Sequence, residues 1–357
     1  MPGELHTVLC ERLGCRFPIV QTAMGWVADA RLVAATCNAG GFGFFAGATA
    51  VPGDVENQIL AIKRLTEKPF GVNFHMFQPN AEEVIAAVIR QKVRAVSYGR
   101  GPDAKTIGRL RDAGVVCMPT VGALKHAVKA VELGADIVTI QGSEGGGHTG
   151  AVPTTLLLPQ LTAVVGVPVV GAGGFFDGRG LVAALAWGAA GIAMGTRFLL
   201  TRDSTVPDAV KARYLAAALT DTVVTRAVDG YPQRVIRTAM VDRLERSLPG
   251  VSFARAAANA LRLRKLTATP LSALIREGLA MRKGSELTWA QAAMAANAPM
   301  LTRSAMVEGR LEAGILPTGQ VAGLIEELPS VAELVARIMA EGGESLDRLC
   351  AGKEARE

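Results

Sequence analysis

Short apolar runs alternate with amphipathic segments along the first two-thirds of the chain. We interpret eight of the runs as buried strands, because a parallel strand covered on both faces is apolar throughout. These strands are Pro18–Met24, Phe42–Ala46, Phe70–Phe74, Arg94–Tyr98, Val115–Thr120, Asp136–Gln141, Pro168–Gly171 and Gly191–Gly195. The segments between them predict helices with one buried face, as in Asp54–Thr66 and Gly178–Trp187.

This alternation predicts the fold class. Strands and helices joined by short links require right-handed crossovers and a parallel sheet. Eight repeats in about 200 residues fit an α/β protein of the (β/α)8 TIM barrel type better than an open doubly wound sheet. Residues 1–220 are therefore expected to form the barrel, with Asp208–Leu219 as its eighth helix.

The pattern changes after the eighth strand. Thr222–Arg226 and Arg234–Arg237 predict a small hairpin around Asp229-Gly230. We expect residues 221–316 to form a mainly helical cap over the barrel mouth, and residues 317–357 to return to the barrel.

Composition excludes several classes of function. Aromatic residues make up 5% of the chain, so a nucleic-acid stacking surface is not expected. Every apolar stretch of 18 residues is interrupted by a glycine, a proline or a polar residue, so we expect no membrane helix. The first 15 residues contain no apolar segment of the kind found in signal peptides, so we expect no signal peptide. The five cysteines lack metal or redox spacing, which favours a reduced, cytoplasmic setting.

The net charge of +6 is concentrated in one segment. Residues 221–290 hold twelve Lys and Arg against six Asp and Glu, which accounts for the whole imbalance. A basic surplus in this segment favours a small anionic ligand over a general nucleic-acid surface.

The stretch after the sixth strand carries the candidate chemistry. Gln141 is followed by five glycines and His148, at the strand end where barrel active sites lie. Glycine lets a ligand approach the backbone closely, and histidine titrates near neutral pH, so we predict His148 as a catalytic base. An inert surface loop is the alternative, and His75 is the competing base. Glu144 could orient His148 or face water, with water slightly favoured.

Other strand ends suggest a flavin site. Glycine-rich turns follow the seventh and eighth strands, where such barrels bind phosphate. The carboxamides Asn73 and Gln141 both donate and accept, which suits the edge of an isoalloxazine ring, although each could only tie down backbone. Strand-end lysines and metal-ligand spacings are absent from the sequence, which argues against an aldolase or a metallohydrolase. Together these features predict bound FMN.

Five motifs resemble one known family. PIVQTAMGW, GVNF, QGSEGGGHTG, GAGGFFDGRG and AMGTRFLLT are similar to the nitronate monooxygenase (2-nitropropane dioxygenase) family of FMN-dependent TIM barrels, over about residues 15–325. Flavin-dependent enoyl-thioester reductases share that scaffold. The resemblance implies that His148 is the base. It also implies flavin contacts at Ala23, Met24, Asn73, Gln141 and Gly146, and phosphate contacts at Gly173, Gly174, Ala193, Met194, Gly195 and Thr196.

A narrower resemblance extends into the cap. GGHTGAVPTTLLLP and MRKGSELTWAQAAMAANAPML resemble the IpdC-type, steroid-degrading branch, described as dehydrogenating a hydroxylated methyl-oxo-indane carboxyl-CoA. The leading expectation is therefore α,β-dehydrogenation of an acyl-CoA. Nitronate oxidation, enoyl-thioester reduction and a non-catalytic flavin binder are the alternatives. NAD or another electron acceptor, and a homodimer, are left open; no nucleic-acid or membrane partner is expected.

Overall fold

Eight parallel strands close into a barrel in the computed structural model. It describes residues 5–247 apart from 77, 79 and 100, the single residues 258 and 261, and residues 297–354. Around the barrel the order is β1-β2-β3-β4-β5-β6-β8-β9, and β9 pairs with β1. The strands are β1 Ile19–Gln21, β2 Phe42–Phe45, β3 Gly71–Phe74, β4 Ala95–Tyr98, β5 Val116–Val121, β6 Val138–Gln141, β8 Val169–Ala172 and β9 Gly191–Met194. The predicted TIM barrel is confirmed.

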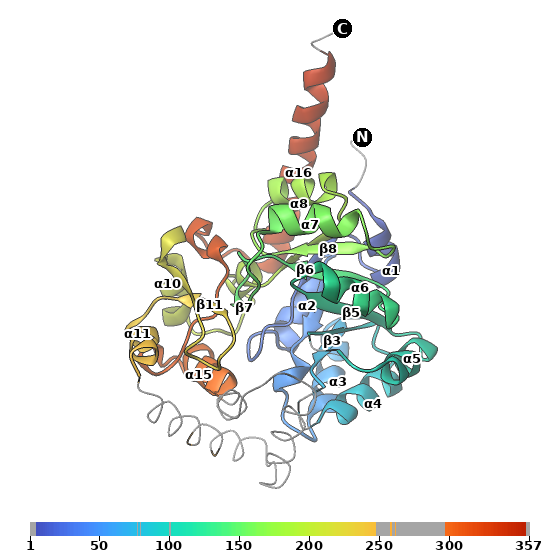
Figure 1. Ribbon diagram of the computed structural model, residues 1–357. Helices are drawn as coiled ribbons and strands as arrows, with labels where there is room; N and C mark the ends of the chain where they lie inside the picture. Colours follow the sequence, from blue (N-terminus) through green and yellow to red (C-terminus); the bar gives the residue numbers. More distant parts are fainter. Residues whose placement is uncertain are drawn as a thin grey trace.

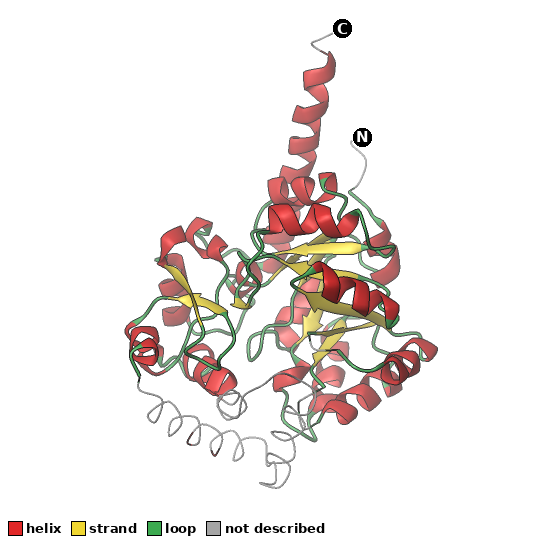
Figure 2. Cartoon of the chain, in the orientation of Figure 1, coloured by secondary structure: helices red, strands yellow, loops and turns green. Residues whose placement is uncertain are grey.

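Helices surround this barrel on the outside (Figures 1 and 2). They alternate with the strands as the apolar pattern predicts, and several begin at an aspartate whose carboxylate accepts from the first turn, as Asp29 and Asp103 do. The barrel helices are α2 Ala30–Asn38, α3 Val55–Leu65, α4 Ala81–Arg90, α5 Ala104–Asp112, α6 Leu124–Glu132, α7 Thr154–Thr162, α8 Gly178–Ala186 and the short α9 Thr196–Leu199. The segment expected to be the eighth barrel helix forms α10 (Asp208–Leu215), which stands apart from these helices in Figure 1 and whose Arg213 donates to the Arg237 carbonyl.

Alternate residues of the strands face the barrel interior and the surrounding helices. Val20, Met118 and Ala193 belong to the cluster inside the barrel, which α1 (Val8–Leu13) closes at its amino end with buried Leu9 and Leu13. Residues of the other parity face the helices. The strands are therefore buried on both faces, which explains their uninterrupted apolar sequence.

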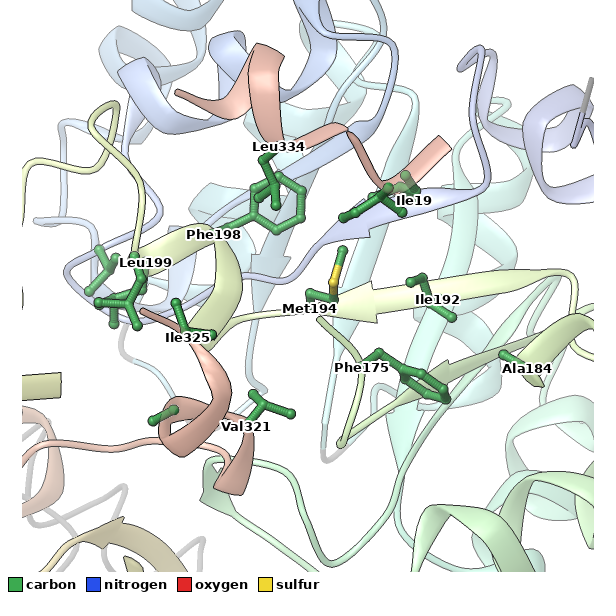
Figure 3. Packing of buried hydrophobic residues seen from close by; sticks show 14 of the residues in the cluster. Ile19, Phe175, Ala184, Ile192, Met194, Phe198, Leu199, Val321, Ile325 and Leu334 are labelled. Carbon is green, nitrogen blue, oxygen red and sulfur yellow. The ribbon is translucent and has the colours of Figure 1, made fainter. Parts of the chain in front are cut away.

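The larger core lies between the barrel and the elements around β9 (Figure 3). Ile192 and Met194 of β9 belong to it, together with Phe198 from α9 and Leu334 from α16 (Val331–Glu354). Helix α16 packs against α8 and α2, and its last turns extend beyond the barrel (Figure 1). The C-terminal residues thereby add to the barrel core.

A small sheet stands at the carboxyl end of β6. β10 (Thr222–Thr225) and β11 (Gln233–Ile236) form the hairpin expected from the sequence, and β7 (Gly147–His148) joins as a third antiparallel strand. The sequence did not predict this third strand. Beside the sheet are α11 Ala239–Glu245, α15 Asn297–Met306, and the short 3-10 turns η3 Leu311–Ala313 and η4 Gln320–Leu324.

No helix within the described part of the chain is long and apolar enough to span a lipid bilayer.

Candidate active site

His148 lies on a strand rather than on a loose loop. The glycine-rich stretch after β6 runs directly into β7, where His148 stands opposite Gln233 of β11 and Gly147 opposite Arg234. Gly147 has φ 67°, a left-handed conformation that glycine adopts without steric cost. Pairing with the hairpin therefore fixes the position of the histidine backbone.

The His148 ring contacts a buried carboxylate. Its Nε2 lies 2.8 Å from Oδ2 of Asp229, and the amide Nε2 of Gln233 donates to the same oxygen at 2.7 Å. The two nitrogens are 3.1 Å apart. The side chain of His148 is 61% exposed whereas that of Asp229 is 6% exposed, so one edge of the ring is held and the other is accessible.

The turn before β11 holds Asp229 in place. Its Oδ1 accepts from the main-chain N–H of Tyr231 at 3.1 Å, and the Tyr231 ring meets the His148 ring edge-on with centroids 6.0 Å apart. Val228, the preceding residue, is fully buried, and its carbonyl accepts from Asn297 of α15. Asp229 is thus fixed on both sides before any ligand binds.

Sequence reasoning missed Asp229 and Gln233 as site residues. Asp-Gly is a common turn dipeptide, and it was interpreted only as the tip of the hairpin. The sequence feature that could have indicated them is an acidic side chain and a carboxamide close to a turn, Asp229 and Gln233, before a strand able to pair with the stretch that contains His148. Nothing local in the sequence indicates that pairing.

The two expectations for Glu144 are both wrong. Its carboxylate neither contacts His148 nor simply faces water: it accepts from the main-chain N–H of Thr154 at 2.9 Å and from its hydroxyl at 3.0 Å. Thr154 is the first residue of α7, so the negative charge caps the positive end of that helix.

Arg234 ties the glycine-rich stretch to the small sheet. Its Nε and Nη2 donate to the Ser143 carbonyl at 3.1 and 3.0 Å, and its Nη1 donates to the Thr222 hydroxyl. Desolvation lowers the pKa of Arg234, and the nearby Glu144 carboxylate partly offsets the shift. These contacts make Arg234 part of the scaffold beneath His148.

The two carboxamides stand at the inner rim of the barrel. The alternation of β3 and β6 turns Asn73 and Gln141 inward, since their neighbours Val72 and Ile140 belong to outer clusters. Asn73 donates to the Ser97 carbonyl at 3.1 Å, and Gln141 donates to the His148 carbonyl at 2.8 Å. Their amide nitrogens thus bind neighbouring protein groups, and a carboxamide oxygen can in addition accept a hydrogen bond.

The turns after β8 and β9 fit a phosphate group. Among the described residues, the main-chain N–H groups of Gly173, Gly174, Gly195 and Thr196 donate no hydrogen bond. Unpaired N–H groups on adjacent strand ends are the donors that bind a terminal phosphate. The first turn of α8 does not add to them, because Asp177 accepts from Gly180 N and Glu341 from Gly178 N.

The remaining residues expected to contact the flavin lie in different surroundings. Ala193 faces the barrel interior, whereas the Met194 side chain is buried in the outer core, so only its main chain is accessible from the barrel (Figure 3). Ala23 and Met24 follow β1 and are half-buried. A Cβ on Gly146 would lie 2.5 Å from the Thr318 carbonyl carbon, so Gly146 packs against the returning segment.

Two further expectations concern His75, the competing base, and the cations of the cap. His75 is exposed after β3, and its main-chain N–H donates to Gln78. The cap cations Arg255, Arg262, Arg264, Lys265, Arg282 and Lys283 lie outside the described residues.

Comparison with known proteins identifies the family. Residues 6–341 match the nitronate monooxygenase family model. The chain is 52% identical to a (3aS,4S,5R,7aS)-5-hydroxy-7a-methyl-1-oxo-octahydro-1H-indene-4-carboxyl-CoA dehydrogenase of Mycobacterium tuberculosis, covering 95% of this chain and 96% of that protein. A protein of the same name from Rhodococcus jostii is 51% identical, with 97% and 98% covered. The structure of FabK from Thermotoga maritima superposes with TM-score 0.77 at 33% identity, over 97% and 99% of the two chains. The chain belongs to the nitronate monooxygenase family and is a flavin-dependent oxidoreductase.

Proposed function

We propose that this protein is an FMN-dependent dehydrogenase that introduces an α,β double bond into a hydroxylated methyl-oxo-indane carboxyl-CoA, in steroid ring C/D catabolism. The observation that carries the proposal is the likeness to two dehydrogenases named for that substrate, at 52% and 51% identity over nearly the whole chain. The matched length includes the cap, where a substrate would be selected.

The residues that would hold FMN are the unpaired N–H groups after β8 and β9, around its phosphate, and Asn73 and Gln141 beside its ring. Bound flavin supplies a hydride acceptor. The chain itself supplies the base. His148, with one ring edge exposed and the other on Asp229, would remove the proton α to the thioester carbonyl.

The basic surplus of residues 221–290 supports a CoA ester over a small substrate. CoA carries a diphosphate and a 3′-phosphate that must stay outside the barrel while the thioester reaches the flavin. Arginine and lysine side chains bind such phosphates through charge-assisted hydrogen bonds. We propose that the cap supplies these side chains. We also propose that the enzyme is cytoplasmic, that NAD could be its electron acceptor and that it could act as a homodimer.

Nitronate oxidation is the second candidate. It is favoured by the family itself and by a probable nitronate monooxygenase of Staphylococcus aureus, 29% identical over 66% of this chain. The same histidine would deprotonate a nitroalkane. A small nitronate, however, has no use for the basic surplus of the cap.

Anaerobic mixing of the purified, FMN-loaded protein with each substrate class tests the proposal. We expect the indane carboxyl-CoA to bleach the flavin within seconds, and alkyl nitronates to do so far more slowly. Rapid bleaching by nitronates alone would replace the proposed function with the second candidate. A flavin that no donor reduces would indicate a binding protein.

A further inference from the structure

We propose that Asp229 is a positioning residue that keeps the proton of the His148 ring on Nε2, so that Nδ1 is the nitrogen that accepts the substrate proton. This inference rests on the proposed role of His148 as the base, and it holds for an acyl-CoA or a nitroalkane alike.

Three atoms determine the protonated nitrogen. Oδ2 of Asp229 lies 2.8 Å from His148 Nε2 and 2.7 Å from Gln233 Nε2, and the two nitrogens are 3.1 Å apart. A carboxylate oxygen only accepts and an amide nitrogen only donates. One arrangement satisfies both short contacts: the His148 ring and the Gln233 amide each donate an N–H to Oδ2 of Asp229. The 3.1 Å distance between the two nitrogens then separates two donors. Nε2 therefore carries the proton.

The tautomer follows from the chemistry of the neutral ring. A neutral imidazole has one donor nitrogen and one acceptor nitrogen, so a proton on Nε2 leaves the lone pair on Nδ1. In the described part of the chain no group bonds to Nδ1. The base is thus presented on the exposed edge of a side chain that is 61% exposed.

The carboxylate is too well fixed to move with the ring. The Asp229 side chain is 6% exposed, its Oδ1 accepts from Tyr231 N, and Gln233 is 2% exposed on a strand paired with β7. Because His148 and Gln233 are direct partners across β7 and β11, backbone pairing holds the Gln233 side chain beside the ring, and its amide donates to the Asp229 carboxylate.

The proton and electrons balance without moving the Nε2 proton. The substrate Cα–H bond breaks, its electron pair stays on carbon, and the proton forms a new bond to Nδ1. The ring becomes an imidazolium whose positive charge lies beside the Asp229 carboxylate, which remains ionised. A preorganised carboxylate stabilises that charge as it develops.

The change Asp229→Asn tests the assignment. The Tyr231 N–H still requires an acceptor at the position of Oδ1, so an asparagine presents its amide nitrogen to Nε2. Nε2 must then accept, which shifts the ring proton to Nδ1. In serine proteases the corresponding change keeps the geometry but imposes the wrong tautomer, and the rate falls about 10⁴-fold. For D229N we expect flavin to bind normally and its reduction by substrate to slow by roughly 10³-fold. The control Asp221→Asn removes a charge that accepts from Ala218 N near the same sheet, and should leave the rate unchanged.

Nitrogen-15 NMR of histidine-labelled, substrate-free holoprotein gives a readout that needs no activity. The chain has four histidines, so the His148 signals can be assigned by their loss in His148→Gln. We expect the proton on Nε2 in the wild type and in D221N, and on Nδ1 in D229N. A wild-type ring protonated on Nδ1, or a D229N protein with unchanged tautomer and rate, would overturn the proposal. Failure of acyl-CoA to bleach wild-type flavin would instead count against the proposed function, with the NMR result still deciding the role of Asp229.

Discussion

Asp229 and His148 lie 81 positions apart in the chain and 2.8 Å apart in space. Neither residue alone indicates the pair, because an aspartate before glycine is common in turns. What joins them is the antiparallel pairing of β7 with β11. At the scale of single residues, the proposed role of His148 therefore depends on a backbone contact between the segment after β6 and the β10–β11 hairpin.

Replacing His148 should separate base catalysis from cofactor binding. For His148→Ala we expect unchanged FMN content and flavin reduction slowed by roughly 10²–10⁴-fold, the usual loss when a general base is removed. Stopped-flow absorbance under anaerobic conditions measures that rate. His75→Ala is the matched control, because His75 also follows a barrel strand. If H75A slows reduction while H148A does not, the base is His75.

At the scale of elements, the turns after β8 and β9 present main-chain N–H groups at neighbouring strand ends. The two strand ends could be located from sequence because glycines follow each apolar run. The sequence could not show that Asp177 and Glu341 already cap α8, since Glu341 belongs to the distant α16. The turn itself, rather than that helix terminus, is therefore the candidate phosphate site.

A side chain at Gly174 should weaken FMN binding specifically. Gly174 has φ 89°, and a Cβ there would meet protein atoms only at 3.9 Å or more, so its effect inside the protein is backbone strain. Gly53 is the matched control, because it has φ 84° and an added Cβ there would have no protein atom within 4 Å. For both alanine variants we expect a stability loss of about 1–2 kcal/mol. Only G174A should raise the Kd for FMN, by roughly tenfold or more in a fluorescence titration, a loss of about 1.4 kcal/mol. Equal FMN affinity in the two variants would move the phosphate site elsewhere.

Trp26 connects the barrel to α15 of the cap. It adopts φ 66°, unusual for a bulky residue, and its Nε1 donates to the Pro299 carbonyl at 3.0 Å. The Arg303 guanidinium lies 5.6 Å from its ring centroid. Strain of this kind persists only where surrounding contacts enforce it. We therefore interpret Trp26 as a rigid contact, called here the Trp26 joint, that holds α15 against the loop after β1.

The change Trp26→Phe removes the hydrogen bond and weakens the cation–π contact. A hydrogen bond contributes about 0.5–1.5 kcal/mol, so we expect the KM for acyl-CoA to rise by roughly 2- to 10-fold with little change in kcat. Trp187→Phe, at the end of α8, is the control and should alter stability alone. A KM unchanged in W26F would mean that this joint does not position the substrate.

At the scale of the whole molecule, residues 221–290 have a basic surplus equal to the net charge of +6, and the charges of the rest of the chain sum to zero. Several barrel arginines form ion pairs, as Arg90 does with Glu56 and Arg109 with Glu82. A surplus concentrated in one segment of the sequence favours binding of an anionic ligand. The charge distribution thus agrees with a CoA ester.

Neutralising pairs of cap cations should raise KM for acyl-CoA. Two charge-assisted phosphate contacts contribute about 1.5–3 kcal/mol each, so we expect Arg262→Ser with Arg264→Ser to raise KM by roughly 10²-fold or more. Exposed charges are screened within about 10 Å at about 0.1 M salt, so the effect should shrink in high salt. The control neutralises Lys105 and Lys125, which lie on barrel helices, and should change nothing. Unchanged acyl-CoA affinity with efficient nitronate turnover would contradict the CoA assignment.

The sequence by itself determined the barrel. Buried parallel strands must be apolar on both faces and the helices must each bury one face, so eight repeats in order could form little else. It also located His148, Asn73, Gln141 and the two glycine turns at strand ends, because a barrel brings all those ends to one rim. Local pattern was sufficient for these positions.

Only the tertiary structure decided what contacts His148. The third strand of the small sheet is two residues long, too short to leave a periodic pattern. Glu144 carries the charge nearest to His148 in sequence, yet it caps α7, while Asp229 reaches the ring through a pairing between distant segments. Contacts of that kind depend on how two chain segments meet in space, and spacing along the sequence does not record it.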